Sequence, residues 1–572
     1  MIKKITGYLD AKKELPETYL AWPLFGSGIE NLGKNGKPIS RPIPEIRSNE
    51  ILMRIDACSL CYTDVKAVTL GSKHPRFIGK DLSTNPVVPG HELTMTVVKV
   101  GDDLSEHYHI GERYTMQPNI WVNGKSMPFC FEYDGGLRQY AVIGEDIIHG
   151  NEGNYLIPIH GNITYASSAL AEPWSCVEAA YRMIYRQCIN NNGVVWFCGC
   201  DNSRNGYQIN KIWGNPKRVL ISDIPSDLEE TIIHHYQEDG IEPEIHSFQS
   251  IINQNIKIDD ILILDGNTSM IDAASEKLNT NGILTILNNK PLDGMIKIDL
   301  GKLHYDMIAY IGTHSLTIDD AYLKNPIRTE LFQNGYCWIL GAGGPLGRMH
   351  LQRALEMERH PNKILATNRG LERLSAVWDD FSNLAHKKNI ELDAISPTHH
   401  QELYKQYLHD IGQSGGFQDI VVMVARAETV ADAIPYLSQY GVLNLFAGIN
   451  RGITAEVDAW SICGPKQIRL IGHSGSNLND QIHTVKKILE GNLQPELSVA
   501  AVGGLNQLID GLQAMIDEKY TGKIIIYPHI VDFPLTALNE FQSRDPEVYD
   551  ALIASKFWGV EAEKIFLENH LA

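Results

Sequence analysis

A glycine-rich turn between a strand and a helix is the sequence feature that most constrains how this chain can fold. The apolar run Cys337–Leu340 leads into the turn, and a helical pattern follows over Arg348–Glu358. Glycines here permit a tight turn and let backbone N–H groups approach a pyrophosphate, to which the helix N-terminus adds a partial positive charge. A second strand, Lys363–Ala366, follows as a dinucleotide-binding fold requires. We therefore expect cofactor contacts at Gly341, Gly343, Gly344, Pro345, Leu346 and Gly347.

The residues at strand ends bear on the cofactor. An acidic residue after the second strand binds the ribose of NAD, whereas an uncharged residue followed by arginine suits the 2′-phosphate of NADP. Asn368 and Arg369 stand there and favour NADP, with an exposed loop arginine as the alternative interpretation. Ala447 and Gly448, with Gly472–Gly475, follow later strands and are expected to face the nicotinamide, unless they are glycine turns without contact.

The alternation of strands and helices that contains this turn occurs twice. Trp196–Gly199 corresponds to Trp338–Gly341, and Asp260–Leu264 corresponds to Asp419–Met423. The matching order and spacing favour duplication of one domain, although any two βαβ domains resemble each other at this level. We therefore expect two doubly wound domains in tandem.

The first copy differs at its glycine turn. Asp201 stands where the close-approach glycine is needed, and a carboxylate there repels a pyrophosphate. Asp223, at the end of the next strand, keeps the residue type that binds a ribose. We expect this copy to bind no dinucleotide and to act as a spacer, an oligomerisation surface or an accessory-ligand site.

Composition narrows the function classes. Lys and Arg total 50 against 69 Asp and Glu, and the net charge of −19 disfavours binding to nucleic acid or to an anionic membrane surface. No export-signal pattern and no run of membrane-spanning length is visible, and nine cysteines do not resemble a disulfide scaffold. A cytoplasmic protein is the simplest expectation.

The N-terminal part carries candidate metal ligands. The first 150 residues hold short β-patterns broken by Gly and Pro, and a helical pattern follows over Ser167–Arg186. Cys61, His91 and Glu172 are the residue types that hold a catalytic zinc with an open position. Taken singly, each suits a buried thiol, a core histidine or a helix N-terminal acid equally well.

Together these segments resemble the zinc-type medium-chain dehydrogenase/reductases, most closely the polyol and L-sorbose-1-phosphate reductase branch. The resemblance covers the chain apart from about residues 191–335. It rests on Ala57-Cys58-Ser59-Leu60-Cys61-Tyr62-Thr63-Asp64, Gly90-His91-Glu92, Gly111-Glu112-Arg113, Gly135-Gly136-Leu137, Glu172-Pro173, the Gly341 turn, and the tail Gly522–Ile530 with Phe533–Thr536.

The resemblance implies an α/β plus β architecture. Residues 1–190 would form a β-rich GroES-like catalytic domain with a bridging helix, and residues 523–572 would return to it. Between them would lie the first Rossmann-like domain, residues 191–335, and the cofactor-binding one, residues 336–522. Substrate would bind in the cleft against the dinucleotide domain.

The resemblance also implies the site roles. One zinc would be held by Cys61 and His91, with Glu92 and Glu172 as carboxylate ligands that exchange during turnover. Asp64 would orient His91, and Thr63 would pass the alcohol proton toward solvent.

Several positions depart from the family or stay open. Lys66 replaces the histidine that ends the family's proton relay, and a lysine can relay a proton or bind an anion on the substrate. Only Cys130 lies where a structural zinc lobe would need four cysteines, and Cys58 is expected to be a passive neighbour of Cys61 rather than a redox partner. Weaker pocket candidates are His74-Pro75-Arg76, Glu132 and Tyr133.

The leading hypothesis is reversible oxidation of a secondary hydroxyl on a sugar, polyol or sugar phosphate, with NADP or NAD. A redox-neutral epimerase or lyase that keeps its cofactor is the alternative among enzymes, and a non-catalytic sensor or scaffold is the alternative outside them. A homo-oligomer, dimer or tetramer, is expected from the family.

Overall fold

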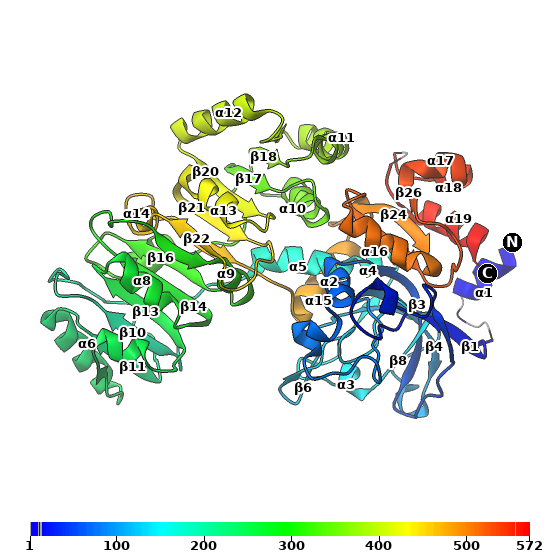
Figure 1. The fold of residues 1–572 in the computed structure, drawn as a ribbon, viewed down its shortest axis with the longest axis horizontal. Coiled ribbons are helices and arrows are strands. Elements are labelled where there is room, and N and C mark those ends of the chain that lie inside the picture. The colour runs from blue at the N-terminus through cyan, green and yellow to red at the C-terminus, as the bar shows by residue number, and fades with distance from the viewer. Residues whose placement is uncertain (1, 10, 12–13, 555, 572) are drawn as a thin grey trace. The chain divides into compact units, whose positions relative to one another are not determined.

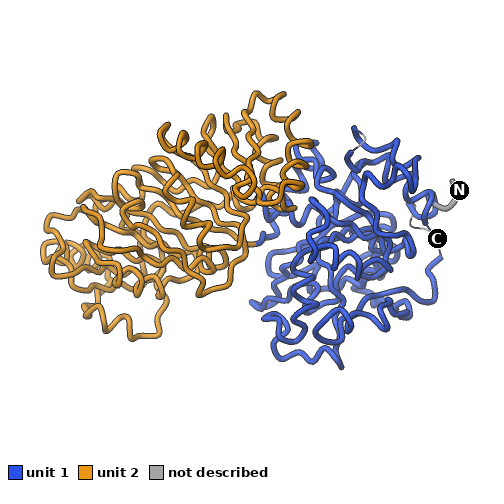
Figure 2. Tube along the Cα trace, turned by 45° about the horizontal axis from the view of Figure 1, so that its top comes forward, with its two compact units in different colours: residues 1–178, 475–572 blue, residues 179–474 orange. Residues whose placement is uncertain are grey.

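The computed structural model describes residues 2–9, 11, 14–554 and 556–571, and the chain forms two compact units (Figure 1). Unit 1 comprises residues 1–178 and 475–572, and unit 2 comprises residues 179–474 (Figure 2). The first boundary falls inside helix α5 (Ala171–Arg182). Within the described residues, no helix has the length and apolarity that a bilayer crossing requires.

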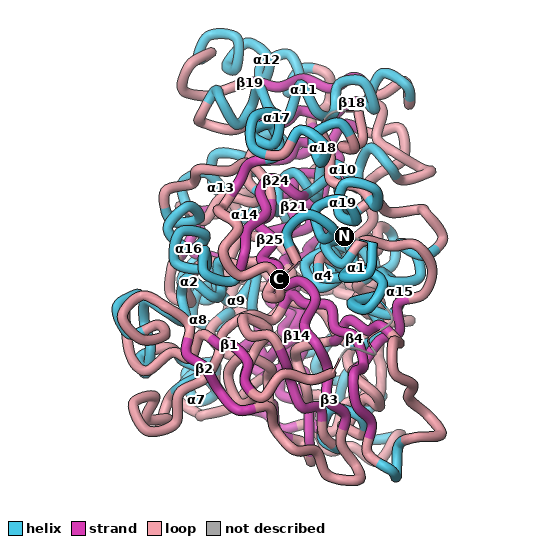
Figure 3. The backbone as a smooth tube through the Cα atoms, turned by 90° about the vertical axis from the view of Figure 1, so that its right-hand side faces the viewer, coloured by secondary structure: helices cyan, strands magenta, loops and turns pink. Residues whose placement is uncertain are grey.

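Unit 1 is built on an eight-stranded sheet in the order β26-β24-β25-β3-β4-β5-β9, with β8 beside β3. Figure 3 labels β24, β25, β3 and β4 of this sheet. Antiparallel pairing with β3 lays β4 on one side and β25, from the C-terminal part of the chain, on the other. Every residue of β3 is buried, so this strand runs through the core of the unit. The strands are β3 (Ile51–Ser59), β4 (Glu92–Val100), β5 (Arg113–Met116), β8 (Tyr140–Ile143), β9 (Leu156–Ile159), β24 (Val499–Gly504), β25 (Lys523–Tyr527) and β26 (Thr536–Ala537).

Two small hairpin-like sheets and a set of helices complete unit 1. The small sheets are β1 (Thr18–Ala21) with β2 (Ile39–Pro42), and β6 (Trp121–Val122) with β7 (Lys125–Ser126). The helices are α1 (Ile2–Leu9), α2 (Tyr62–Leu70), α3 (Glu145–Ile148), α4 (Tyr165–Ala169), α15 (Leu478–Leu489), α16 (Leu508–Ile516), α17 (Phe541–Arg544), α18 (Pro546–Asp550) and α19 (Val560–His570).

The helix expected over Ser167–Arg186 is two helices, α4 and α5, and it ends earlier than expected. The Thr329 hydroxyl lies 3.0 Å from the carbonyl oxygen of Tyr181 and 2.9 Å from that of Met183. These contacts satisfy carbonyl groups that a longer helix would have used, and so they favour the end at Arg182.

Unit 2 is built on one twelve-stranded sheet in the order β12-β11-β10-β13-β14-β16-β23-β21-β20-β17-β18-β19. Its strands are β10 (Val194–Cys198), β11 (Arg218–Ser222), β12 (Glu244–Ile245), β13 (Ile258–Leu264), β14 (Leu278–Leu287), β16 (Ala309–Thr313), β17 (Tyr336–Leu340), β18 (Lys363–Thr367), β19 (Glu391–Ile395), β20 (Phe417–Val422), β21 (Leu437–Leu445) and β23 (Arg469–Gly472). The helices are α6 (Ser226–Glu238), α7 (Phe248–Ile252), α8 (Thr268–Ser275), α9 (Leu300–Tyr305), α10 (Pro345–Glu356), α11 (Leu371–Lys387), α12 (Gln401–Gln413), α13 (Ala427–Ala433) and α14 (Ala459–Cys463).

The sheet consists of two halves with the same topology. Counted along the chain, each half has the strand order 3-2-1-4-5-6, which is the order of a doubly wound dinucleotide-binding sheet. All pairs inside a half are parallel, and the halves meet where the sixth strands, β16 and β23, pair antiparallel. Two separate α/β domains were expected, but the two copies share one sheet and one core cluster.

The junction between the halves has matching contacts on its two sides. Strands β15 (Ile296–Asp299) and β22 (Thr454–Val457) pair antiparallel, while α9 of the first half packs on β23 and α14 of the second packs on β16. A Cβ atom at Gly312 would lie 2.9 Å from the Cβ of Cys463, and one at Gly472 would lie 2.4 Å from the carbonyl oxygen of Leu303. The glycines in the two sixth strands, Gly312 and Gly472, therefore leave room for the short helix of the opposite half to pack against the strand.

The expected boundaries differ from the observed ones. The chain returns to unit 1 at Gly475 rather than at residue 523, and the first segment of unit 1 ends at 178 rather than at 190. The segment β24-α16-β25 is a parallel strand–helix–strand unit. Its sequence pattern is the same as that of the α/β domain before it, and the sequence alone therefore assigns the segment to that domain. Pairing of β25 with β3 places it in unit 1.

The close approach at Gly472 generates a stability prediction. Gly472→Ala places a methyl group against the Leu303 backbone, which has no flexible side chain to move aside. We expect the free energy of unfolding to fall by about 2 kcal/mol, within the range for overpacked sites. Gly412→Ala, in open space on α12, is the control and should be neutral or slightly stabilising. Equal unfolding free energies of the two variants in denaturant titrations would contradict the close packing of Gly472 against the Leu303 backbone.

Candidate active site

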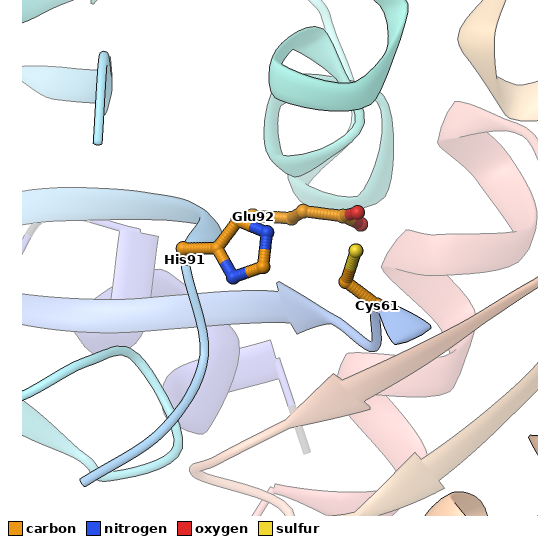
Figure 4. Close-up of side chains that lie close together, drawn as sticks. All are labelled: Cys61, His91 and Glu92. Carbon is orange, nitrogen blue, oxygen red and sulfur yellow. The ribbon is translucent and has the colours of Figure 1, made fainter. Parts of the chain in front are cut away.

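Three side chains that can bind a metal converge at one end of the central strands of unit 1. Cys61 stands between the end of β3 and the first turn of α2, where it is the N-cap residue. His91 and Glu92 come at the start of β4, whose first residue pairs with Ser59, the last residue of β3. The antiparallel register thus brings together two segments that are separated in sequence (Figure 4).

The geometry of this cluster suits a zinc ion. The ligand atoms of Cys61, His91 and Glu92 all lie within 4.8 Å of one another, and His91 and Glu92 are buried. Zinc binds sulfur at about 2.3 Å and nitrogen or oxygen at about 2.0–2.2 Å, so two ligand atoms on one ion lie less than about 4.5 Å apart, which is compatible with this limit. A thiolate, an imidazole and a carboxylate form a donor set that leaves a fourth position open, as catalytic zinc requires. The residues present therefore fit the ion.

Asp64 supports both segments of the cluster. Its Oδ2 accepts the backbone N–H of Cys61 at 2.9 Å, and its Oδ1 accepts the backbone N–H of Gly90 at 3.0 Å. Oδ1 also lies 3.6 Å from His91 Nδ1, and Cys130 Sγ lies 3.8 Å from the same nitrogen. The carboxylate of Asp64 is thus placed to orient the His91 ring and to fix the loop that carries it.

Lys523 is a charged residue of the site that sequence reasoning missed. It is the first residue of β25, and its Nζ lies 2.7 Å from both carboxylate oxygens of Glu92. Both side chains are buried. Burial alone lowers the pKa of Lys523, but the charges of Glu92 and Cys61 outweigh it and raise the pKa, so the lysine stays protonated. Its only sequence signal is the position before the closing apolar strand.

The other residues predicted around the metal lie on neighbouring helices of unit 1. Glu172, in the first turn of α5, is buried, and its Oε1 lies 3.8 Å from Cys176 Sγ. Burial raises the pKa of its carboxyl group. Among the described residues, Glu172 belongs to neither of the two groups whose possible ligand atoms all lie within 4.8 Å of one another. Thr63 and Lys66 both lie on α2, with Thr63 half-buried and Lys66 exposed.

The glycine turn of unit 2 has the backbone shape that its sequence suggests. Strand β17 ends at Leu340, Gly341 adopts a φ of 86°, and α10 begins at Pro345. A Cβ atom at Gly347 would lie 2.2 Å from the Gly341 carbonyl oxygen, which only glycine allows. Gly344 has open space around it, so the turn exposes backbone to an incoming group.

Residues predicted near the rest of the cofactor follow other strands of the same half. Asn368 and Arg369 come directly after β18, and the Arg369 side chain is exposed. Ala447 and Gly448 follow β21, and the Ala447 N–H donates to the Val422 carbonyl at 3.0 Å. The carboxyl ends of parallel strands share one edge of a sheet, so these residues lie on the edge that carries the Gly341 turn.

The corresponding turn of the first half has a different structure. Residues 199–217 form turns and loop between β10 and β11, with no helix. The Arg204 side chain forms a two-point contact with Asp265, and the Tyr207 hydroxyl donates to the same carboxylate at 2.9 Å. This half therefore lacks a counterpart of helix α10, whose N-terminus follows the Gly341 turn in the second half and could accept a pyrophosphate.

Comparisons with known proteins agree with this architecture. Residues 47–152 match the family described as alcohol dehydrogenase GroES-like domain. Mannitol-1-phosphate 5-dehydrogenase of Aliivibrio fischeri is 22% identical over 536 residues, covering 92% of this chain and 93% of the relative. L-sorbose 1-phosphate reductase of Klebsiella pneumoniae is 24% identical over 314 residues, covering 49% and 72% respectively.

Among solved structures, a protein assigned as an alcohol dehydrogenase from Sinorhizobium meliloti 1021 aligns with a TM-score of 0.50 at 13% identity. The alignment covers 90% of this chain and all of that one, and it supports the fold alone. The chain thus contains a region, residues 47–152, that matches the alcohol dehydrogenase GroES-like domain, and it is similar to proteins named as a dehydrogenase and a reductase.

Proposed function

We propose that the protein is a zinc-dependent oxidoreductase that transfers a hydride between a nicotinamide cofactor and a secondary alcohol or ketone of a sugar, polyol or sugar phosphate. The observation that carries this proposal is the convergence of Cys61 with the buried His91 and Glu92 inside a region that matches the alcohol dehydrogenase GroES-like domain. The names of the relatives, which include a mannitol-1-phosphate dehydrogenase and a sorbose 1-phosphate reductase, support the substrate class.

The chemistry divides between the bound groups and the chain. A zinc ion held by Cys61 and His91 supplies Lewis acidity to the substrate oxygen, and NAD(P) supplies or accepts the hydride. Asp64 holds the two ligand segments in place through its contacts with the backbone of Cys61 and Gly90. Thr63, half-buried in the first turn of α2, would pass the alcohol proton outward, and Lys66 follows one turn later.

Lys523 and the metal compete for the Glu92 carboxylate. Both oxygens of Glu92 lie within ion-pair distance of the lysine, while the carboxylate is also part of the ligand cluster. We infer that Glu92 is held by Lys523 in one state and binds the metal in the other. The second carboxylate, Glu172, is the candidate for the ligand position when Glu92 is held by the lysine.

Within unit 2, we assign cofactor binding to the second half of the sheet. Its Gly341 turn has the open backbone that a pyrophosphate needs, and Arg369 beyond β18 favours NADP. The first half lacks the corresponding helix. We assign it a structural role instead, because its strand β16 pairs with β23, the strand that would otherwise form the edge of the second half. If the protein forms a homo-oligomer, another surface than the β23 edge must mediate it.

The metal assignment is tested by replacing one ligand. Cys61→Ala removes the thiolate, and we expect loss of bound zinc and a decrease of at least about a thousandfold in kcat/KM for polyol phosphate oxidation, because Lewis-acid catalysis is worth several kcal/mol. Cys58→Ala, three residues away in the same segment, should keep both zinc and activity.

Metal analysis and absorbance of the reduced nicotinamide are the two readouts. Full zinc content and activity in Cys61→Ala would contradict the assignment. Zinc-dependent turnover without any net change in nicotinamide absorbance would point to the redox-neutral alternative instead.

The Lys523–Glu92 pair gives a second prediction. Lys523→Met leaves the Glu92 carboxylate buried without a partner, and we expect the metal-free protein to lose about 3–5 kcal/mol of unfolding free energy. The double variant Lys523→Met with Glu92→Gln removes both charges and should recover most of this loss. Excess zinc should also rescue Lys523→Met by binding the freed carboxylate. Additive losses in the double variant would show that the pair is not coupled.

A further inference from the structure

Three basic side chains gather between the two ligand segments of unit 1. Lys66 lies on α2, His74 directly precedes the short 3-10 turn Pro75–Phe77, and Arg76 lies within that turn. Lys66 and Arg76 are exposed, while His74 is half-buried. All three stand in the stretch of chain that connects Cys61 to His91.

The Phe131 ring contacts two of these residues, His74 and Arg76. The His74 ring stacks on the Phe131 ring with centroids 5.0 Å apart and an interplanar angle of 23°. The Arg76 guanidinium carbon lies 5.1 Å from the centroid of the same ring. Phe131 is buried, so its ring is fixed, and contact with it restricts both side chains.

The hydrogen bond of His74 determines what its free edge can offer. The backbone N–H of Arg76 donates to His74 Nδ1 at 3.2 Å. In the neutral ring the proton must then be on Nε2, which makes that nitrogen a donor. His74 therefore presents an N–H group, and Arg76 presents a planar set of donors beside it.

The charges of this cluster are not neutralised by the protein. Among the described residues, no acidic side chain forms an ion pair with Lys66, His74 or Arg76, and the adjacent Glu132 is paired with Lys80 at 3.8 Å. Burial lowers the pKa of His74, and the positive charges of Arg76 and Lys66 lower it further. The cluster is thus locally basic, although the chain as a whole carries a net charge of −19.

The cluster adjoins the metal-binding residues. Phe131 directly follows Cys130, whose Sγ lies 3.8 Å from His91 Nδ1. Lys66 lies one helical turn beyond Thr63 on α2. A substrate whose oxygen is at the metal could therefore extend a second group toward the three basic side chains within unit 1.

We propose that His74, Arg76 and Lys66 form a binding subsite for a phosphate monoester on the substrate. The proposal rests on the proposed function and narrows it, because it makes a sugar or polyol phosphate the preferred substrate over the neutral polyol. Arg76 and the Nε2–H of His74 donate to phosphate oxygens, and Lys66 adds charge from the α2 side. Anion binding would also offset the uncompensated positive charges of Arg76 and Lys66.

Inorganic phosphate is the first probe, because it carries the anion without a sugar and undergoes no turnover. Its affinity is measured by calorimetry on the zinc-loaded full chain with saturating NADP⁺, so that the phosphate positions of the cofactor are filled. We expect Arg76→Gln and His74→Ala each to weaken phosphate binding about tenfold, the typical cost of a charge-assisted hydrogen bond. Lys73→Gln, which removes a nearby exposed lysine, should leave it unchanged.

D-mannitol 1-phosphate and D-mannitol are the second pair of probes, compared by kcat/KM. We expect Arg76→Gln to reduce the ratio of phosphorylated to neutral substrate about tenfold and leave the value for mannitol unchanged. The same phosphate affinity in wild type and Arg76→Gln, or an equal loss in Lys73→Gln, would overturn the subsite. Phosphate binding that depends on Arg76 without any hydride transfer would leave the subsite intact and refute the proposed function instead.

Discussion

The antiparallel pairing of β25 with β3 and of β3 with β4 is the constraint on which the candidate site depends. It joins a strand that begins at Lys523 to two strands from the first hundred residues. Lys523 is thereby placed against Glu92, from which it is separated by 431 residues of sequence. Cys61 lies just beyond the end of β3, at the N-cap of α2. A charge pair this deeply buried is stable only when both partners are present, so the strand register, the ion pair and the ligand cluster support one another.

The fold of unit 2 reflects a second constraint, which is that an exposed edge strand of a sheet must be paired or covered. A strand at the edge of a sheet exposes unpaired N–H and C=O groups that invite pairing with another chain. Here the sixth strand of one half pairs with the sixth strand of the other, and the short helices α9 and α14 cover the opposite halves. The first half thus keeps the topology of a dinucleotide-binding sheet while its turn is closed by Arg204 and Asp265.

The local features of the fold were predictable from the sequence. The Gly341 turn, its preceding strand and its following helix occur where apolar runs and glycines indicate them, because such patterns reflect contacts within a few residues. That the first half binds no dinucleotide, as Asp201 leads us to expect, stays a prediction. The absence of a helix between β10 and β11 was not predicted from the sequence.

Features that depend on distant pairing were not predictable in this way. The return of the chain at Gly475 was missed because β24-α16-β25 has the same strand–helix–strand pattern as the domain before it. Lys523 was missed because a single lysine before an apolar strand reads as a solvated end, and only the register with β3 and β4 buries it. The proposed roles of Cys61, His91 and Glu92 came from resemblance to a family, since each residue alone suits an ordinary buried position.

The most direct test of the metal centre is X-ray absorption at the zinc edge on the full-length protein purified without chelator. One sulfur at about 2.3 Å, with nitrogen and oxygen neighbours at about 2.0–2.2 Å, is the first shell that a Cys61, His91 and carboxylate site predicts. A shell of several sulfurs, or one that keeps its sulfur in Cys61→Ser, would contradict it.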